Sequence, residues 1–167
     1  NGREETTSFV LIPLVCNAVK IPVLAAGGIA TGRQMFAAMA LGAEGVQVGS
    51  RFVASEEAIA HPNIKNAVIH ASEGATQLSL KKVVPVRLLK NAFFELVNEA
   101  EMNGASKEEL QLLLGHGRSK KGMFEGNLDE GELEIGQVSA MIRDILPAKT
   151  IVNNLWKEFE EASQNPL

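Results

Sequence analysis

Two short apolar runs, at residues 21–24 and 46–48, each lead into a glycine turn, and a helical pattern separates them. The first turn reads AAGGI at residues 25–29, and the second reads QVGSRF at residues 47–52. Between them, apolar side chains recur at the spacing of one helix face, namely Met35, Phe36, Met39 and Ala40. Strand, turn, helix, strand and turn in this order are typical of a βαβ unit with parallel strands.

The helix between these strands carries a signal at each end. Thr31 and Gln34 have the spacing of a capping box, in which the Gln34 N–H donates to the Thr31 hydroxyl and the Gln34 side chain reaches back. Gly42 is predicted to end the helix as its C′ residue. A further helix is predicted over residues 6–19, and we expect Pro13 to restrict it to one side.

The pattern changes after Phe52, and the rest of the chain reads as mostly helical. Ser106 and Glu109 form a second predicted capping box, and Pro147 suits a first helical position. The predicted elements are helix at 64–71, an extended stretch at 77–84, helix at 88–102 and 110–114, a loop with a short helix at 115–131, and helices at 135–145 and 147–162.

Composition narrows the class of protein. The chain has 167 residues, 46% of them apolar, which is enough for one domain with a real core. The net charge of −4 argues against a nucleic-acid-binding surface, and no apolar run is long enough to cross a bilayer. Cys16 is the single cysteine, which fits a reducing, cytoplasmic setting and a small core residue.

The beginning of the chain suggests a piece of a longer protein. Residues 1–5 do not read as an initiator sequence, and no Met precedes them. Parallel strands need neighbours on both sides and helices on both faces, and two strands cannot close a barrel. We therefore expect part of the fold to lie outside this sequence.

The two glycine turns predict a phosphate site. A glycine has no Cβ, so backbone N–H groups can close on a phosphate, and a following helix adds its positive dipole end. Barrels of the (β/α)8 type hold phosphate with the loops after strands 7 and 8 in this way. The alternative is that Gly27, Gly28 and Gly49 are only tight turns and that Ser50 caps the helix near Arg51. The spacing is not G-x-G-x-x-G, which argues against a dinucleotide site.

Other polar residues give weaker signals. Gln47 interrupts an apolar strand and either hydrogen-bonds a ligand or satisfies a neighbouring backbone group. Arg51 either neutralises a phosphate or forms an ion pair. His61, His70 and His116 have no partners at metal-ligand spacing, so we expect structural or solvated roles for them.

No acid, base or nucleophile emerges from the motifs. Residues 115–121 lack the order of a P-loop, and residues 125–132 lack the glycine position of an EF-hand. Trp156 is expected in the core or at an interface. Either a cofactor performs the chemistry, or the catalytic residue lies outside this chain.

Several motifs together resemble one family. They are NGREETT at 1–7, PVLAAGGIA at 22–30, GVQVGSRF at 45–52, HPN at 61–63, KGMFEG at 121–126 and GELEIGQ at 131–137. In combination they resemble the nitronate monooxygenase (2-nitropropane dioxygenase) family, which includes FMN-dependent enoyl-acyl-carrier-protein reductases. The last two motifs resemble the reductase branch. The resemblance covers nearly the whole chain but only the C-terminal half of a family member.

The resemblance implies an α/β fold, namely the C-terminal part of a (β/α)8 TIM barrel followed by a mostly helical region. Residues 1–60 would form the last βα units of the flavin-binding barrel, and residues 61–167 a helical region whose helices return to it. By motif match, the FMN phosphate would be bound by Gly28, Gln47, Val48, Gly49 and Ser50, with Gly27 supporting the first turn. The family's catalytic histidine would lie just before Asn1, so no catalytic residue is assigned here, and no metal.

The implied function is oxidation of alkyl nitronates with O2 by an FMN-dependent enzyme. The alternative is NAD(P)H-dependent reduction of an enoyl-acyl-carrier-protein in fatty-acid synthesis. Two further alternatives are an inert fragment and a non-redox phosphate-binding barrel of the IMP dehydrogenase-like or sugar-phosphate type. We expect a small-molecule or acyl-thioester substrate, no nucleic-acid or membrane partner, and a homodimer. Phe93, Phe94, Met123 and Phe124 would either wall the substrate side or pack as an ordinary helical layer.

Overall fold

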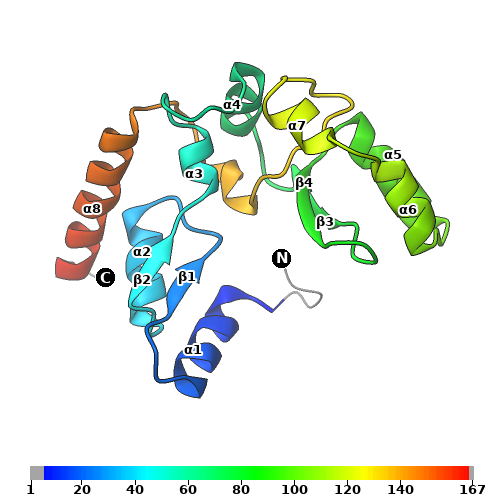
Figure 1. Ribbon diagram of the computed structural model, residues 1–167. Coiled ribbons are helices and arrows are strands. Elements are labelled where there is room, and N and C mark those ends of the chain that lie inside the picture. Colours follow the sequence, from blue (N-terminus) through cyan, green and yellow to red (C-terminus); the bar gives the residue numbers. More distant parts are fainter. Residues whose placement is uncertain (1–5, 166–167) are drawn as a thin grey trace. The chain divides into compact units, whose positions relative to one another are not determined.

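The computed structural model describes residues 6–165, and the chain divides into two compact units. The strand-pair unit consists of the chain up to Ala58 together with the segment that begins at Asp144. The hairpin unit is Ile59–Arg143. Figure 1 follows the chain through the elements of both units.

The strand-pair unit is built around two parallel strands. β1 pairs with β2 in a register that places Leu24 opposite Gly45 and Ala26 opposite Gln47, which confirms the predicted βαβ unit. Helix α2 packs against β2, and α8 lies beside α2 (Figure 1). The elements of the unit are α1 (Ser8–Ala18), β1 (Leu24–Ala26), α2 (Gly32–Ala40), β2 (Gly45–Gln47), α3 (Ser50–Val53) and α8 (Ala148–Gln164).

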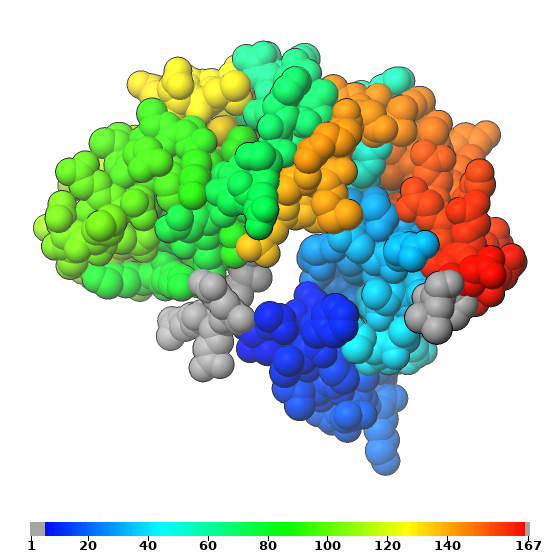
Figure 2. Space-filling view, turned by 180° about the vertical axis from the view of Figure 1, so that it is seen from behind, coloured from blue at the N-terminus to red at the C-terminus, as the bar shows by residue number. Residues whose placement is uncertain are grey.

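Small side chains let the layers of this unit approach closely. Its buried core includes Ala25, Ala38 and Ala43 beside Ile29. A Cβ on Gly32 would overlap backbone atoms of Leu155 and Phe159, so α8 lies directly on the first turn of α2. Figure 2 shows the orange-red surface of α8 adjoining the blue surface of α2.

Helix α1 differs from its prediction and from the other helices. It runs through Pro13 without a break, so the expected restriction at this proline is wrong, and the helix forgoes the hydrogen bond that the missing N–H would make. It buries only Ile12, while Phe9 and Leu14 are 73% and 59% exposed. A helix that is apolar all round is typical of an element buried in a larger structure.

The hairpin unit packs helices against an antiparallel strand pair. β3 and β4 pair with Thr76 opposite Leu89. Its core contains Leu80, Leu88, Phe93, Phe94, Val97 and Leu110. The elements of the unit are α4 (Pro62–Ile69), β3 (Thr76–Ser79), β4 (Val86–Leu89), α5 (Ala92–Met102), α6 (Lys107–Leu114), α7 (Arg118–Met123) and a 3-10 turn, η1 (Gln137–Met141).

Local capping signals were reliable, whereas two apolar runs were misassigned. Both capping boxes are present, and Gly42 follows α2 with a φ of 105°. The helix predicted over 88–102 begins only at Ala92, because residues 86–89 pair with β3. The helix predicted over 135–145 is reduced to η1, because the Ile135 N–H donates to Arg87 O beside β4. Tertiary pairing in both cases decided between strand and helix for a short apolar run.

The start of α8 also differs by one position. Pro147 is the N-cap residue rather than the first helical residue. It offers no side-chain acceptor, and the carboxylate of Glu57 supplies one, accepting from the Ala148 N–H at 2.8 Å.

Candidate functional site

The pairing register brings the two glycine turns to the same edge of the strand pair. Ala26 and Gln47 are paired at the ends of β1 and β2. Gly28 follows the first of them by two residues, and Gly49 follows the second by two residues. Because parallel strands end at the same edge, both turns leave the pair side by side, as the sequence predicts. All three glycines of the turns are exposed in this chain.

The glycines at these turns are there for different reasons. Gly27 and Gly28 have φ values of 90° and 75°, which disfavour any side chain. Gly49 has an ordinary φ of −105°, and a Cβ added there would meet nothing within 4 Å. Neither strain nor crowding within the described residues therefore requires glycine at position 49. Close approach of another group to this backbone is the remaining physical reason for it.

The helix ends contribute less to this site than the sequence suggested. Helix α3 has only four residues, and Gly49 rather than Ser50 is its N-cap, so its dipole is small. The start of α2 is already bound by protein groups, since the Gly32 N–H donates to Glu158 Oε2 at 2.7 Å. The Ala30 N–H donates to Gln34 Oε1 at 2.8 Å. These N–H groups at the start of α2 therefore bind protein groups rather than a phosphate. The backbone amides of the two glycine turns remain as candidate phosphate donors.

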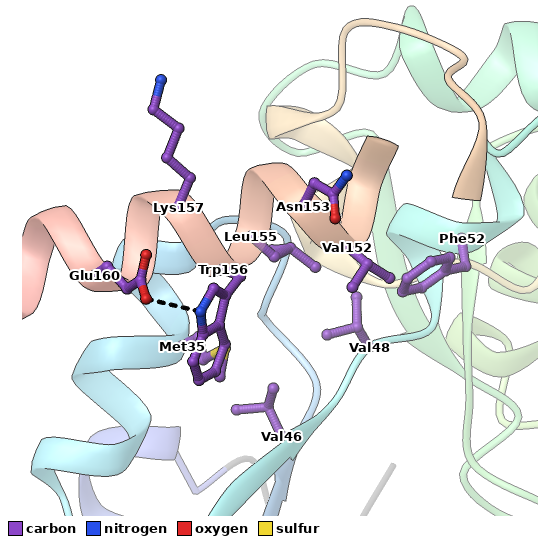
Figure 3. A pocket seen from close by; sticks show the side chains of 10 residues that line it. All are labelled: Met35, Val46, Val48, Phe52, Val152, Asn153, Leu155, Trp156, Lys157 and Glu160. Carbon is purple, nitrogen blue, oxygen red and sulfur yellow. Dashed lines mark hydrogen bonds between the residues drawn. The ribbon is translucent and has the colours of Figure 1, made fainter. Parts of the chain in front are cut away.

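The side chains of β2 separate into two faces. Gln47 is exposed, and within residues 6–165 its side chain makes no hydrogen bond, so it does not serve a neighbouring backbone group. Val46 and Val48 point the other way, toward α8 (Figure 3). A ligand at the glycine turns would therefore meet the Gln47 amide and only the backbone of Val48.

Arg51 forms an ion pair rather than facing the turn. It is 8% exposed, and its guanidinium pairs with the carboxylate of Asp144 and donates to the Asp144 carbonyl at 3.0 Å. It also donates to the Ala54 carbonyl at 3.5 Å. Arg51 thus joins α3 to the segment that precedes α8, and its charge is directed to Asp144 rather than to the glycine turns.

An apolar groove of about 510 Å³ lies on the other face of β2. Trp156 is half exposed there, donates from Nε1 to Glu160 Oε1 at 2.9 Å and stacks on Phe159 (Figure 3). Its walls include Met35, Val46, Val48, Phe52 and Val152. Because Gln47 faces away from these residues, the groove is separate from the glycine turns.

The histidines for which the structure shows contacts have structural roles. His61 is the N-cap of α4, and its Nδ1 accepts from the Asn63 N–H at 3.1 Å. His70 Nδ1 lies 2.8 Å from the carbonyl of Asn66. In the part of the chain that is described, no group of three His, Cys, Asp or Glu residues is arranged to hold a metal ion. Among the same residues no helix has the length and apolar character to span a bilayer.

The motifs at residues 121–126 and 131–137 contain glycines at close contacts within the hairpin unit. A Cβ on Gly131 would overlap the Cα of Gly122, and a Cβ on Gly126 would overlap the His61 ring. Phe93 and Phe94 are buried in the core, in agreement with the packed-layer alternative, whereas Phe124 is 50% exposed. Sequence reasoning missed these glycine contacts, because no local pattern shows which distant segment a glycine will meet. The motif at residues 1–7 falls mostly outside the described residues.

Comparisons with known proteins agree with this α/β arrangement. The family model for nitronate monooxygenase matches residues 1–158. A probable nitronate monooxygenase from Bacillus subtilis is 32% identical over 158 residues, which are 94% of this chain and 45% of that protein. The chain therefore spans about half the length of the curated relatives it matches.

Solved structures give the same result. FabK from Thermotoga maritima is 40% identical, with a TM-score of 0.89 over 96% of this chain and 51% of that chain. Nitroalkane oxidase from Streptomyces ansochromogenes is 32% identical, with a TM-score of 0.78 over 95% of this chain and 45% of that chain. The matched part is an α/β segment, and no closed barrel exists within residues 6–165. This chain belongs to the nitronate monooxygenase family.

Proposed function

We propose that this chain supplies the phosphate-binding part of an FMN-dependent oxidoreductase that oxidises alkyl nitronates with O2. The observation that carries the proposal is Gly49, whose backbone is exposed beside the first glycine turn although no described residue of the unit crowds that position. Family membership supports the same assignment. The substrate follows from the name of the family and of the curated relatives.

The residues present fit a phosphate ester held by uncharged donors. Amides of Gly28 and Gly49 would bind the FMN phosphate, and the exposed Gln47 amide and Ser50 would add side-chain donors. When bound, FMN would supply the electron transfer. This chain would bind and orient the phosphate end, while Arg51, held by Asp144, stays out of the site.

A second candidate reaction is NAD(P)H-dependent reduction of an enoyl thioester. It is supported by residues 121–126 and 131–137, which resemble the reductase branch of the family. Two assays on the native gene product, purified as its host makes it, separate the reactions. Oxygen uptake with a nitronate indicates the first, and NAD(P)H oxidation with a crotonyl thioester indicates the second. A small-molecule substrate corresponds to the first reaction and an acyl-thioester to the second.

Native mass spectrometry of the same preparation tests the cofactor. FMN as the bound ligand would support the proposal. A different phosphate ester would instead favour a non-redox barrel. A colourless protein that gains no flavin on reconstitution would favour an inert chain.

The substitution Gly49→Leu tests whether the two glycine turns bind the phosphate. We expect the affinity for FMN to fall more than about tenfold while riboflavin, which lacks the phosphate, binds as before. The melting temperature should stay near that of wild type, since the space at Gly49 is open. Ala40→Leu adds the same side chain at an exposed position of α2 and should change neither affinity. Unchanged FMN affinity in Gly49→Leu would place the phosphate elsewhere.

A further inference from the structure

Several N–H groups of the backbone that follows the first glycine turn donate to protein groups. The N–H groups of Ala30 and Thr31 donate to Gln34 Oε1 at 2.8 and 3.2 Å. The Gln34 N–H donates to the Thr31 hydroxyl at 3.2 Å. The Gly32 N–H donates to Glu158 Oε2 at 2.7 Å. A helix start normally leaves its first amides without intrahelical partners, and here protein groups take them.

Glu158 differs from the other acceptors in its distance along the chain. Gln34 and Thr31 lie within one helical turn of the amides they bind, whereas Glu158 is 126 residues from Gly32. The local bonds shape the start of α2, but they cannot fix it relative to another element. The bond from the Gly32 N–H to the carboxylate from α8 joins this backbone to a second helix.

Close backbone packing places Glu158 beside Gly32. A Cβ on Gly32 would overlap Leu155 O and Phe159 N, and it would lie 2.6 Å from Glu158 Cβ. The α8 backbone and the α2 backbone are therefore in direct contact at the residue that donates the hydrogen bond. This packing brings the exposed side chain of Glu158 within reach of the Gly32 N–H, and a charged acceptor strengthens the bond.

We propose that Glu158 is a positioning residue for the glycine turn at Gly27 and Gly28. The turn is attached at one end to β1, whose last residue pairs with Gln47. At the other end it is attached through Gly32 to Glu158. Two consecutive glycines with positive φ lie between these points, and glycine has the largest backbone freedom of any residue. Glu158 restricts that freedom and so holds the amides of the turn in one arrangement before a ligand arrives.

The effect on the backbone is independent of any ligand, whereas its benefit for FMN affinity rests on the proposed function. Amide hydrogen exchange of residues 27–32, measured without flavin, therefore tests the positioning directly. In Glu158→Ala we expect exchange in this segment to be about five- to tenfold faster than in wild type, as for loss of a helix-capping acceptor. Glu158→Gln keeps an acceptor oxygen without the charge and should fall between the two.

Two control variants separate positioning from general loss of stability. Glu161→Ala removes a carboxylate from the exposed face of α8, where it pairs with Lys157 at 3.8 Å, and should leave residues 27–32 unchanged. Ile151→Val weakens the buried face of α8 by deleting one methyl group. If Ile151→Val accelerates exchange of residues 27–32 as much as Glu158→Ala does at equal loss of melting temperature, the proposal is overturned.

Flavin binding by the native gene product then tests the consequence. Glu158→Ala should lower the ratio of FMN affinity to riboflavin affinity about fivefold, because only the phosphate contact depends on the turn. A ratio that stays at the wild-type value despite faster exchange would contradict the role in ligand binding. Absence of FMN binding by the wild-type protein would refute the proposed function, and the exchange data would still decide the role of Glu158 in the backbone. If Glu158→Ala does not fold, Glu158→Gln provides the same comparison.

Discussion

The backbone N–H of Gly32 donates to the carboxylate of Glu158 at 2.7 Å, which joins the first turn of α2 to α8. The two residues are 126 positions apart, and neither stands in a motif that predicts the contact. Both glycine turns follow strands of the same unit, so this link connects the end of the chain to the candidate phosphate site. Contacts of this kind explain why a helix at the C-terminus can matter to a site near the N-terminus.

Gly32→Ala is expected to destabilise the strand-pair unit by about 2–3 kcal/mol. The added methyl group would meet backbone atoms of α8, which cannot rotate away as a side chain can. Urea unfolding followed by circular dichroism measures the loss. Gly49→Ala is the matched control and should change stability by less than about 0.5 kcal/mol, since its Cβ has open space. Equal effects of the two variants would contradict the contact between α2 and α8.

Arg51→Lys should also weaken the strand-pair unit, by about 1–2 kcal/mol. The guanidinium of Arg51 reaches the Asp144 carboxylate and the Ala54 carbonyl together, and a single ammonium group cannot replace that geometry. Thermal unfolding is the measurement. Lys157→Ala breaks the exposed pair with Glu161 and should cost less than about 0.5 kcal/mol. A loss in Arg51→Lys no larger than in this control would show that the fork of bonds made by Arg51 contributes nothing.

Glu132 should make the stability of the protein fall as pH rises. Burial raises the pKa of its carboxyl group, and the neighbouring Glu134 carboxylate raises this pKa further, against the opposing charge of Arg118. The folded state therefore binds its proton more tightly than the unfolded state. Extra stability is present below the ordinary value of 4.5 and is lost as pH rises through the raised pKa.

Glu132→Gln tests this effect, because glutamine cannot ionise. The variant should be more stable than wild type at pH 7, and the difference should shrink to zero below pH 4.5. Denaturant unfolding between pH 3 and pH 8 measures both proteins. Glu134→Gln, at an exposed position, should show a smaller gain. A difference between Glu132→Gln and wild type that does not vary with pH would rule out the titration as its cause.

Ser106→Ala should raise the pKa of Glu109. The Ser106 backbone N–H donates to the Glu109 carboxylate at 2.7 Å, and this bond, together with the Ser106 side chain, lowers the pKa of Glu109 from its ordinary value. The stabilisation is present above pH 4.5 and is lost as pH falls through the lowered pKa. NMR titration of the Glu109 side chain should show its pKa moving toward 4.5 in the variant, whereas Ser72→Ala should leave it unchanged. Alanine keeps the backbone N–H, so a Glu109 pKa that does not respond to Ser106→Ala would contradict the contribution of the Ser106 side chain.

Local sequence motifs predicted several of the helix ends correctly. The capping boxes at Thr31 and Ser106 and the glycine at Gly42 were predicted correctly, because each depends on atoms within about one helical turn. The strand β4 and the turn η1 were missed, because their apolar residues fit either helix or strand until a partner strand is chosen. Pairing energy from distant residues makes that choice, and no window of sequence contains it.

For the candidate site, the sequence by itself determined where the glycine turns stand, that each follows an apolar strand, and that a capped helix lies between them. Those features depend on backbone freedom and on neighbouring residues. The tertiary structure alone decided that the Gly32 N–H at the start of α2 donates to Glu158 and that Arg51 forms an ion pair with Asp144. It also decided that a side chain has open space at Gly49 and none at Gly32. The physical reason is that each of these facts depends on which residues, far apart in the sequence, lie close together in the folded chain.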